Sequence, residues 1–428
     1  AKGIGGTSTD NIASVAETKD GGYIVGGYFY SKSIDLGNGV NLTNKGIGYS
    51  DGMIIKYSSD GEIEWAKSIG GTNIELINSV TETRDGDYIV VGYFNSKSID
   101  LGNEVSLSNN GYTDGMIIKY SINGEVEWAE GIGGRSDDRI TSVAATSDGG
   151  YIVGGEFQSS SIDLGTGISL ANKGSSDDGM IIKYNTVGEV EWAEGIGESG
   201  SDQINTVAST SDGGYIVGGH FSSSSIDLEN GISLTNKGSN DGMVIKFDKV
   251  ELPNPTVIQA QVIGGTSNDK IRSVAECSDG GYIVGGYFSS SSIDLGTGIS
   301  LTNKGYYDGM IIKYNAAGEV EWVEGIGGTD NDSINSVSAT TDGGYIVGGY
   351  FKSSSIDLGN GISLTNNGKH DGMIIKYNAR GEVEWAEGIG ESDYDYIESV
   401  LETSDGGYIV GGYFSSSSID LGTGISLT

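Results

Sequence analysis

The stretches INSVSAT-TDGG-YIVGGYF at residues 334–351 and DGMIIKYN-ARGE-VEW at residues 371–385 decide the fold. Asp-Gly between two runs of β-branched and aromatic residues predicts a hairpin. The second stretch forms a similar hairpin, with Gly381 placed for a positive φ. Its continuous apolar runs, Met-Ile-Ile and Tyr-Ile-Val, are typical of strands covered on both faces. We therefore expect four antiparallel strands, called a, b, c and d.

This pattern repeats along the whole chain. YIVGG or a close variant begins at seven tyrosines, 63 to 67 residues apart: Tyr23, Tyr88, Tyr151, Tyr215, Tyr282, Tyr345 and Tyr408. Four-stranded sheets that cover one another's faces describe a β-propeller. We expect an all-β fold, a single seven-bladed β-propeller over residues 1–428 with four antiparallel strands per blade. Its units are 3–66, 67–129, 130–193, 194–261, 262–323, 324–386 and 387–428.

The last of the seven units is shorter than the others. The chain opens within a d strand, at AKGIGG, and stops at GISLT before a seventh strand c. We expect part of a longer polypeptide; otherwise an incomplete last blade has a bare edge that could accept a strand from another chain.

Two further features concern loops. A segment such as SSSIDLGNGISLTNNG, residues 353–368, separates strands b and c. We expect it to form a projecting hairpin in every unit, with Asp35 and its equivalents bonding within the turn. The fourth unit replaces the usual c–d turn with KVELPNPTVIQAQ, and we expect Pro253 and Pro255 in a loop or at an outer edge.

Composition excludes several classes of protein. The 428 residues carry 24 basic and 59 acidic side chains, a net charge of −35, which argues against nucleic acid or an anionic membrane as partner. One cysteine cannot build a disulfide scaffold or a thiolate metal site. No apolar run is long enough for a transmembrane segment. Seventy-four glycines exclude a helical solenoid.

The order of DGGYIVGG, polar hairpin, DGMIIKY and GEVEW resembles the bacterial SBBP-type β-propeller repeat, and the double glycine after strand b is similar to kelch repeats. The resemblance covers essentially the whole chain. It implies a bacterial protein that is extracellular or on the cell surface, with no assigned reaction.

The turns that lead into strands a and c vary most among the units. Because strands a and c run in the same direction, these turns should lie on one face, and loops on a rigid scaffold are where ligands usually bind. The alternative is neutral drift at exposed tips. We name as candidate ligand-binding residues Tyr49, Tyr112, Tyr306, Tyr307, His370, Asp393, Tyr394, Asp395 and Tyr396.

An acid stands two residues before the first isoleucine of strand a in every unit. Around a propeller axis these acids would form a ring of carboxylates suited to Ca²⁺, the one cofactor that we consider. The alternative, which repetition in all units favours, is that each acid caps its own turn. The seven residues are Asp10, Glu75, Asp138, Asp202, Asp269, Asp332 and Asp395.

Other residue types give less support to a reaction. The two histidines, His220 and His370, are in different units, so a histidine metal site lacks ligands. The five tryptophans all stand in strand d, where packing between blades is expected. Catalysis would have to use carboxylates and tyrosines. The richest cluster of such side chains is at residues 393–396, together with Lys369 and His370.

We favour a non-enzymatic binding or adhesion module, extracellular or on the cell surface, that presents its variable turns to a glycan or a protein. One alternative is a carbohydrate-active hydrolase or lyase with carboxylate and tyrosine groups on the same face. Another is a structural subunit that assembles through the incomplete seventh blade.

Overall fold

The structure is a computed structural model that describes residues 1–165, 167–228, 231–249, 255–296, 298–421 and 425–427. These residues are divided between two compact units, which we describe separately. The N-unit comprises Ile4–Ser209 with Val250–Pro255, and the C-unit comprises Thr210–Lys249 and Thr256–Thr428 with Ala1–Gly3.

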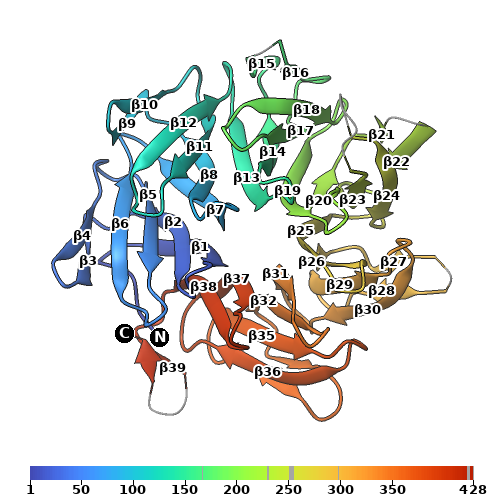
Figure 1. Cartoon of the computed structure of the whole chain (residues 1–428). Helices are drawn as coiled ribbons and strands as arrows, with labels where there is room; N and C mark the ends of the chain where they lie inside the picture. The colour runs from blue at the N-terminus through green and yellow to red at the C-terminus, as the bar shows by residue number, and fades with distance from the viewer. Residues whose placement is uncertain (166, 229–230, 250–254, 297, 422–424, 428) are drawn as a thin grey trace. The chain divides into compact units, whose positions relative to one another are not determined.

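The described strands follow the predicted repeat (Figure 1). Strands a are β1 (Asp10–Glu17), β7 (Glu75–Glu82), β13 (Asp138–Ala145), β19 (Asp202–Ser209), β25 (Asp269–Glu276), β31 (Asp332–Ala339) and β37 (Asp395–Glu402). Strands b are β2 (Tyr23–Phe29), β8 (Tyr88–Phe94), β14 (Tyr151–Phe157), β20 (Tyr215–Phe221), β26 (Tyr282–Phe288), β32 (Tyr345–Phe351) and β38 (Tyr408–Phe414).

Strands c and d come from six of the units only. Strands c are β5 (Asp51–Tyr57), β11 (Asp114–Tyr120), β17 (Asp178–Tyr184), β23 (Asp241–Phe247), β29 (Asp308–Tyr314) and β35 (Asp371–Tyr377). Strands d are β6 (Ile63–Ile69), β12 (Val126–Ile132), β18 (Val190–Ile196), β24 (Val257–Ile263), β30 (Val320–Ile326) and β36 (Val383–Ile389).

The number of blades corrects our expectation. The described residues form six four-stranded sheets in the order a-b-c-d, and the seventh unit adds only the two-stranded sheet β37–β38. The fold is therefore an all-β propeller fold with six blades, not seven. The reason is in the sequence, since these 428 residues contain seven copies of strand b but six copies of DGMIIKY or its variant DGMVIKF.

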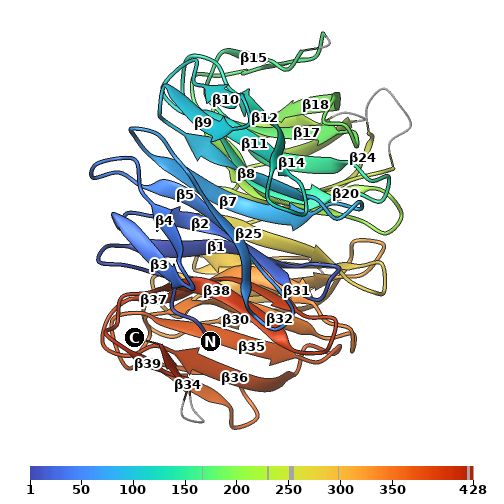
Figure 2. The same ribbon diagram turned by 60° about the vertical axis from the view of Figure 1, so that its left-hand side comes forward.

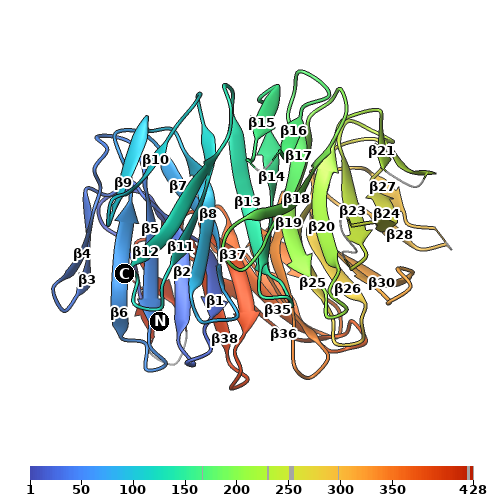
Figure 3. The ribbon, with the colours of Figure 1, turned by 45° about the horizontal axis from the view of Figure 1, so that its top comes forward.

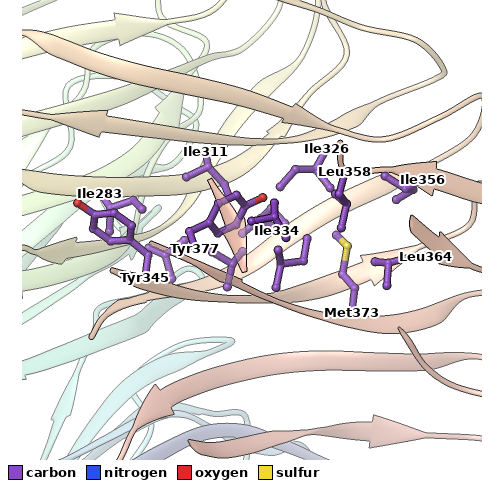
Figure 4. Close-up of a cluster of buried hydrophobic side chains, with 14 of the residues drawn as sticks. Ile283, Ile311, Ile326, Ile334, Tyr345, Ile356, Leu358, Leu364, Met373 and Tyr377 are labelled. Carbon is purple, nitrogen blue, oxygen red and sulfur yellow. The ribbon is translucent and has the colours of Figure 1, made fainter. Parts of the chain in front are cut away.

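Successive sheets within each unit pack face to face. In the N-unit β2 contacts β7, β8 contacts β13, and β14 contacts β19. In the C-unit β20 contacts β25, β26 contacts β31, and β32 contacts β37. Figure 2 shows the sheet that contains β31, β32, β35 and β36 in the C-unit. Figure 4 shows one such core, where Ile283, Ile311 and Ile326 of one sheet meet Tyr345 and Tyr377 of the next.

The double glycine of strand b is explained by close packing on two sides. A Cβ on Gly285 would lie 2.5 Å from a methyl group of Val337 in the next sheet. A Cβ on Gly286 would lie 2.0 Å from the backbone oxygen of Lys270, beside the bulge between Ile271 and Ser273. The second position is glycine in every unit because its Cβ would meet backbone, whereas the first, whose Cβ would meet side chains, is Val91 in β8.

The segment between strands b and c forms a separate two-stranded sheet in each unit. These hairpins are β3 (Ser33–Gly37) with β4 (Val40–Thr43), β9 (Ser98–Gly102) with β10 (Val105–Ser108), β15 (Ser161–Asp163) with β16 (Ser169–Ala171), β21 (Ser225–Leu228) with β22 (Ile232–Thr235), β27 (Ser292–Asp294) with β28 (Ser300–Thr302), β33 (Ser355–Asp357) with β34 (Ser363–Thr365), and β39 (Ile419–Asp420) with β40 (Ser426–Leu427).

The strands of these hairpins contact strand d of their blades, while the turns project as expected, since a Cβ on Gly37, Gly39 or Gly102 would meet nothing within 4 Å. β4 contacts β6 and β10 contacts β12, as Figure 3 shows. Ile34 and Leu42 are buried, because the apolar alternation of the hairpin faces the blade. The predicted turn bond of Asp35 is confirmed, since its carboxylate accepts the Gly37 N–H at 2.9 Å. Pro255 lies outside the strands, two residues before β24, and Pro253 is outside the described residues.

Candidate functional site

The turns that lead into strands c and a of neighbouring sheets meet in the C-unit. His370, before β35, forms a parallel bridge with Tyr394, before β37, and Tyr307 does the same with Asn331. The Asp395 N–H donates to the His370 carbonyl at 2.8 Å. The predicted grouping of these variable turns is therefore confirmed within this unit.

Six ring side chains gather at this position, and we call them the aromatic cluster: Tyr307, Tyr350, His370, Tyr394, Tyr396 and Tyr413. They come from three successive repeats of the C-unit. Strand b supplies Tyr350 and Tyr413, and the start of strand a supplies Tyr396. The preceding turns supply the other three rings.

His370 lies at the centre of the cluster. Its ring stacks on Tyr350 with a centroid distance of 5.3 Å and an interplanar angle of 6°. The ring edge meets Tyr394 at 5.0 Å, and Nδ1 shares a hydrogen bond with the Tyr396 hydroxyl. Tyr396 also stacks on Tyr413 at 5.2 Å. These contacts fix the orientation of the imidazole ring on three sides.

The cluster extends toward the preceding sheet. The Tyr307 and Tyr350 hydroxyls are 2.8 Å apart and hydrogen-bonded. The Tyr307 ring contacts Tyr287 at 4.9 Å, and the Arg272 guanidinium lies over Tyr287 at 5.3 Å. A continuous row of rings therefore crosses three repeats.

Charged side chains border the rings. Lys369 Nζ lies 4.6 Å above the centre of the Tyr394 ring and forms a 2.9 Å ion pair with Asp393. Lys352 forms a 2.8 Å ion pair with Asp330. Each of these two lysines is therefore paired with an acid.

Burial determines the protonation of the central groups. It lowers the pKa of His370, and the nearby Lys352 charge lowers it further, so the imidazole is neutral at pH 7. Burial also raises the pKa of Tyr396 far above its usual value. The His370–Tyr396 pair is thus a neutral hydrogen-bonded pair at physiological pH.

The remaining predicted ligand residues are not all in the cluster. Tyr306 is 74% exposed beside Tyr307. Tyr49 and Tyr112 are in the N-unit, 43% and 75% exposed, and are not part of the cluster. Asp395 is buried and accepts hydrogen bonds from both the N–H and the hydroxyl of Ser416.

The seven acids at the start of strand a adopt the arrangement of the turn-capping alternative. Each accepts an N–H from the residue four positions earlier, at 2.7 to 3.1 Å. Within the described ranges no group of three or more His, Cys, Asp or Glu side chains is placed to hold a metal ion. Ca²⁺ stays an untested prediction for Asp10, Glu75, Asp138, Asp202, Asp269, Asp332 and Asp395.

Tyr350, Tyr413 and Tyr287 were missed as site residues from the sequence. They occupy the sixth position of strand b, which is Tyr28, Tyr93, Glu156 and His220 in the other units. Variation at this position, in a strand that otherwise differs only at Val91, was the available signal. Their inclusion depends on packing between sheets, which the strand pattern does not show.

The prediction that tryptophans pack between blades is confirmed. Trp322 contacts Tyr345 at 5.6 Å and Tyr377 at 6.0 Å in the next sheet, and Trp65 does the same with Tyr88 and Tyr120.

A small cavity of about 160 Å³ lies at the a–b turns of the C-unit, lined by Cys277, Asp279, Thr340 and Tyr345 among others. Burial raises the pKa of the Cys277 thiol to about 12. The thiol is therefore protonated at neutral pH and unsuited to act as a nucleophile.

The sheets and their order define an all-β repeat protein of the β-propeller class. No family model matches the chain. It is 23% identical over 382 residues to the regulatory protein FlaEY of Caulobacter vibrioides, covering 84% of this chain and 38% of that protein. It is 21% identical over 454 residues to an uncharacterized WD repeat-containing protein of Acanthamoeba polyphaga mimivirus, covering 87% of this chain and 32% of that one.

The chain thus spans about a third of the length of these curated relatives. Among solved structures it is similar to the WD40 β-propeller domain of Doa1, with 12% identity, a TM-score of 0.49, and coverage of 96% of this chain and 93% of that one. The expectation of a β-propeller repeat protein is confirmed by the sheets, while the SBBP-type repeat and a bacterial origin stay predictions. Within the described residues no helix is long and apolar enough to cross a membrane.

Proposed function

We propose that this chain is a non-enzymatic binding module and that the aromatic cluster of its C-unit binds a neutral glycan. The observation that carries the proposal is the gathering of six rings from three repeats at the variable turns, around a neutral His370. Ring faces stack on sugar rings, while phenol hydroxyls and the imidazole supply directed hydrogen bonds.

The accessible part of the cluster suits a ligand that lies flat. Tyr394 is 38% exposed and Tyr306, next to Tyr307 in the sequence, is 74% exposed, whereas Tyr350 is 9% exposed. The exposed Tyr394 ring meets His370, which in turn stacks on the buried Tyr350. A net charge of −35 disfavours acidic polysaccharides, so the ligand that we propose is uncharged. A place outside the cell or on a bacterial surface belongs to the same proposal.

A hydrolase or lyase would need free acid and base groups near the rings. Asp395 accepts hydrogen bonds from four donors, and Asp393 is ion-paired with Lys369. Both carboxylates are thus engaged within the protein, which supports a binding role.

The test is a glycan array followed by titration calorimetry on the intact chain. We expect the Tyr394→Ala/Tyr396→Ala variant to lose about tenfold or more of its affinity, because it removes the exposed Tyr394 ring and the Tyr396 hydroxyl that holds His370 in place. The matched control is Tyr49→Ala/Tyr112→Ala, which removes two exposed tyrosines of the N-unit and should bind normally.

Three results would overturn the proposal. They are equal loss in both variants, absence of any glycan ligand, and turnover of the bound glycan in a hydrolase or lyase assay. Circular dichroism and the unfolding midpoint show whether each variant is folded. Tyr394→Ala alone, at an exposed ring, gives a second measurement should the double variant fail to fold.

A further inference from the structure

Three β-bulges of the C-unit place polar side chains beside the aromatic cluster. The bulge residues are Arg272 in β25, Asn335 in β31 and Glu398 in β37, and we call them the polar row. β31 contacts both β25 and β37, so the three residues come from successive repeats. A bulge re-aims a side chain out of the regular strand pattern and is common next to binding sites.

In other repeats the bulge residue supports the fold. Asn78 and Thr141 in the N-unit each donate a 2.7 Å hydrogen bond to the backbone carbonyl of an isoleucine in the next strand a. Asn335 donates the same bond at 3.0 Å. A side-chain donor at this position therefore ties one strand a to the next.

The two charged members of the polar row depart from this role. A carboxylate has no proton to donate, so Glu398 cannot make the bond. Within the described ranges Arg272 does not make it either, and its guanidinium lies over the Tyr287 ring. Both residues belong to the repeats that supply the aromatic cluster. Charge at these two bulges thus accompanies the rings and does not serve the strand-to-strand bond.

The polar row is electrostatically coupled to the rings. The Arg272 guanidinium is 5.3 Å from the centre of the Tyr287 ring. Burial raises the pKa of Tyr350 and of Glu398, and the Arg272 charge opposes both shifts. Burial likewise raises the pKa of Tyr396, and the Glu398 charge adds to that rise. The guanidinium and the carboxyl group therefore both lie near the rings.

Hydrogen-bonding capacity remains on both charged groups. Glu398 Oε2 accepts the Asn335 side-chain N–H at 3.1 Å, which leaves the second carboxyl oxygen for a ligand. Arg272 is exposed, and the part of the chain that the structure describes contains no ion pair of its guanidinium. The row thus offers several N–H donors at one end and an acceptor at the other.

We propose that the polar row selects the sugar that the aromatic cluster binds, by hydrogen-bonding two adjacent hydroxyl groups of one hexopyranose unit. Glu398 accepts a hydrogen bond from one hydroxyl, and the Arg272 guanidinium donates to the oxygen of the other. The inference rests on the glycan-binding proposal and deepens it to sugars that carry a vicinal diol.

The arrangement suits binding more than cleavage of the sugar. Glycoside hydrolysis ordinarily uses two carboxyl groups that flank the bond. Glu398 is one carboxyl group, and the neighbouring Asp393 and Asp395 are engaged by Lys369 and by four donors respectively. We therefore assign Glu398 to recognition of hydroxyl groups.

NMR titrations of the intact chain provide the test. The probes are the methyl α-glycosides of glucose, mannose and galactose, each compared with its 3-deoxy form. Loss of the 3-hydroxyl removes every pair of adjacent ring hydroxyls in these sugars and keeps the ring faces. We expect at least one parent glycoside to bind about tenfold or more tightly than its 3-deoxy form.

Variants show whether the polar row causes this discrimination. Glu398→Ala and Arg272→Ala should each reduce it to about threefold or less, because each removes one partner of the diol. The matched control is Glu402→Ala, which removes another carboxyl group of β37 and should leave the discrimination unchanged. Unfolding midpoints show whether each variant is folded, and Glu398→Gln, which keeps the shape, replaces Glu398→Ala if that variant fails to fold.

The outcomes separate this inference from the proposed function. Glycan binding that Tyr394→Ala weakens, but that does not distinguish the 3-deoxy sugars, would overturn the role of the polar row and leave the proposed function standing. Discrimination that survives both Glu398→Ala and Arg272→Ala would do the same. Absence of binding to every glycan of the array and to all three glycosides would overturn both, and so would release of methanol from the glycosides.

Discussion

The first prediction concerns Asp114, the first residue of β11 in the N-unit, whose carboxyl group is buried beside another acid. Its Oδ2 accepts the Asn110 N–H at 2.8 Å, while Oδ1 has no hydrogen-bond partner. A Cβ on Gly133 would lie 2.5 Å from Asp114 Oδ1 and 3.0 Å from Asp138 Oδ2, so the two carboxyl groups face the same small space. Burial, with the Asp138 charge adding to it, raises the pKa of Asp114 to about 6.

The sign of the effect follows from the two protonation states. The folded-state pKa of about 6 is above the ordinary value of 3.8, so folding favours the protonated acid. The stability that the proton provides is complete below about pH 4 and is lost as the pH rises through 6. A shift of about 2 pKa units corresponds to about 2.7 kcal/mol, of which we expect about 1 to 2 kcal/mol after screening by solvent.

Asp114→Asn removes the charge and keeps the shape. The amide oxygen can still accept the Asn110 N–H, and the amide nitrogen can donate toward Asp138. We expect the free energy of unfolding to rise by about 1 to 2 kcal/mol at about pH 8 and to change by less than about 0.5 kcal/mol at about pH 4. Urea unfolding curves at both pH values, followed by circular dichroism, measure the difference.

The matched control is Asp138→Asn, because Asp138 accepts hydrogen bonds from Gly134, Gln158 and Ser159. An amide nitrogen cannot accept them, so this variant should be less stable at about pH 8. The reasoning is refuted if Asp114→Asn destabilises the chain at about pH 8, or if its effect is the same at both pH values.

Three further predictions concern buried groups of the C-unit. Lys313→Ala should lower the free energy of unfolding by about 2 to 3 kcal/mol in urea titrations, because Lys313 is 1% exposed and pairs with Asp279 at 2.7 Å and Glu321 at 3.0 Å; an unchanged midpoint would contradict this. Gly286→Ala should cost about 2 kcal/mol or more, since its Cβ would meet a backbone oxygen at 2.0 Å, and a thermal midpoint equal to that of the unmodified chain would contradict the packing argument. Cys277 is 6% exposed and burial raises the pKa of its thiol to about 12, so it should react with iodoacetamide at about pH 8 only in denaturant. Mass spectrometry measures the alkylation, and rapid alkylation of the folded chain would contradict the burial of this thiol.

The local structure of each repeat was predictable from sequence because its signals are short-range. Asp-Gly turns, apolar runs and alternating hairpin residues determined strands a to d, and the tryptophan position in strand d indicated contact between blades. The grouping of His370 with Tyr394 and Tyr396 followed from the shared direction of strands a and c. The number of complete blades was wrong, because seven copies of strand b were counted although only six units contain DGMIIKY or its variant.

Sequence alone thus determined the strands, their order in each sheet and the face that carries the variable turns, since all three depend on hydrogen bonding between residues close in the chain. Only the tertiary structure placed Tyr350 beneath His370 and extended the cluster to Tyr413. It also decided that Asp395 is engaged by four donors. The physical reason is that these features depend on the packing of one sheet against the next, where side chains about 60 residues apart in the sequence meet. Burial at these contacts then determines which polar groups keep a proton and which find a hydrogen-bond partner.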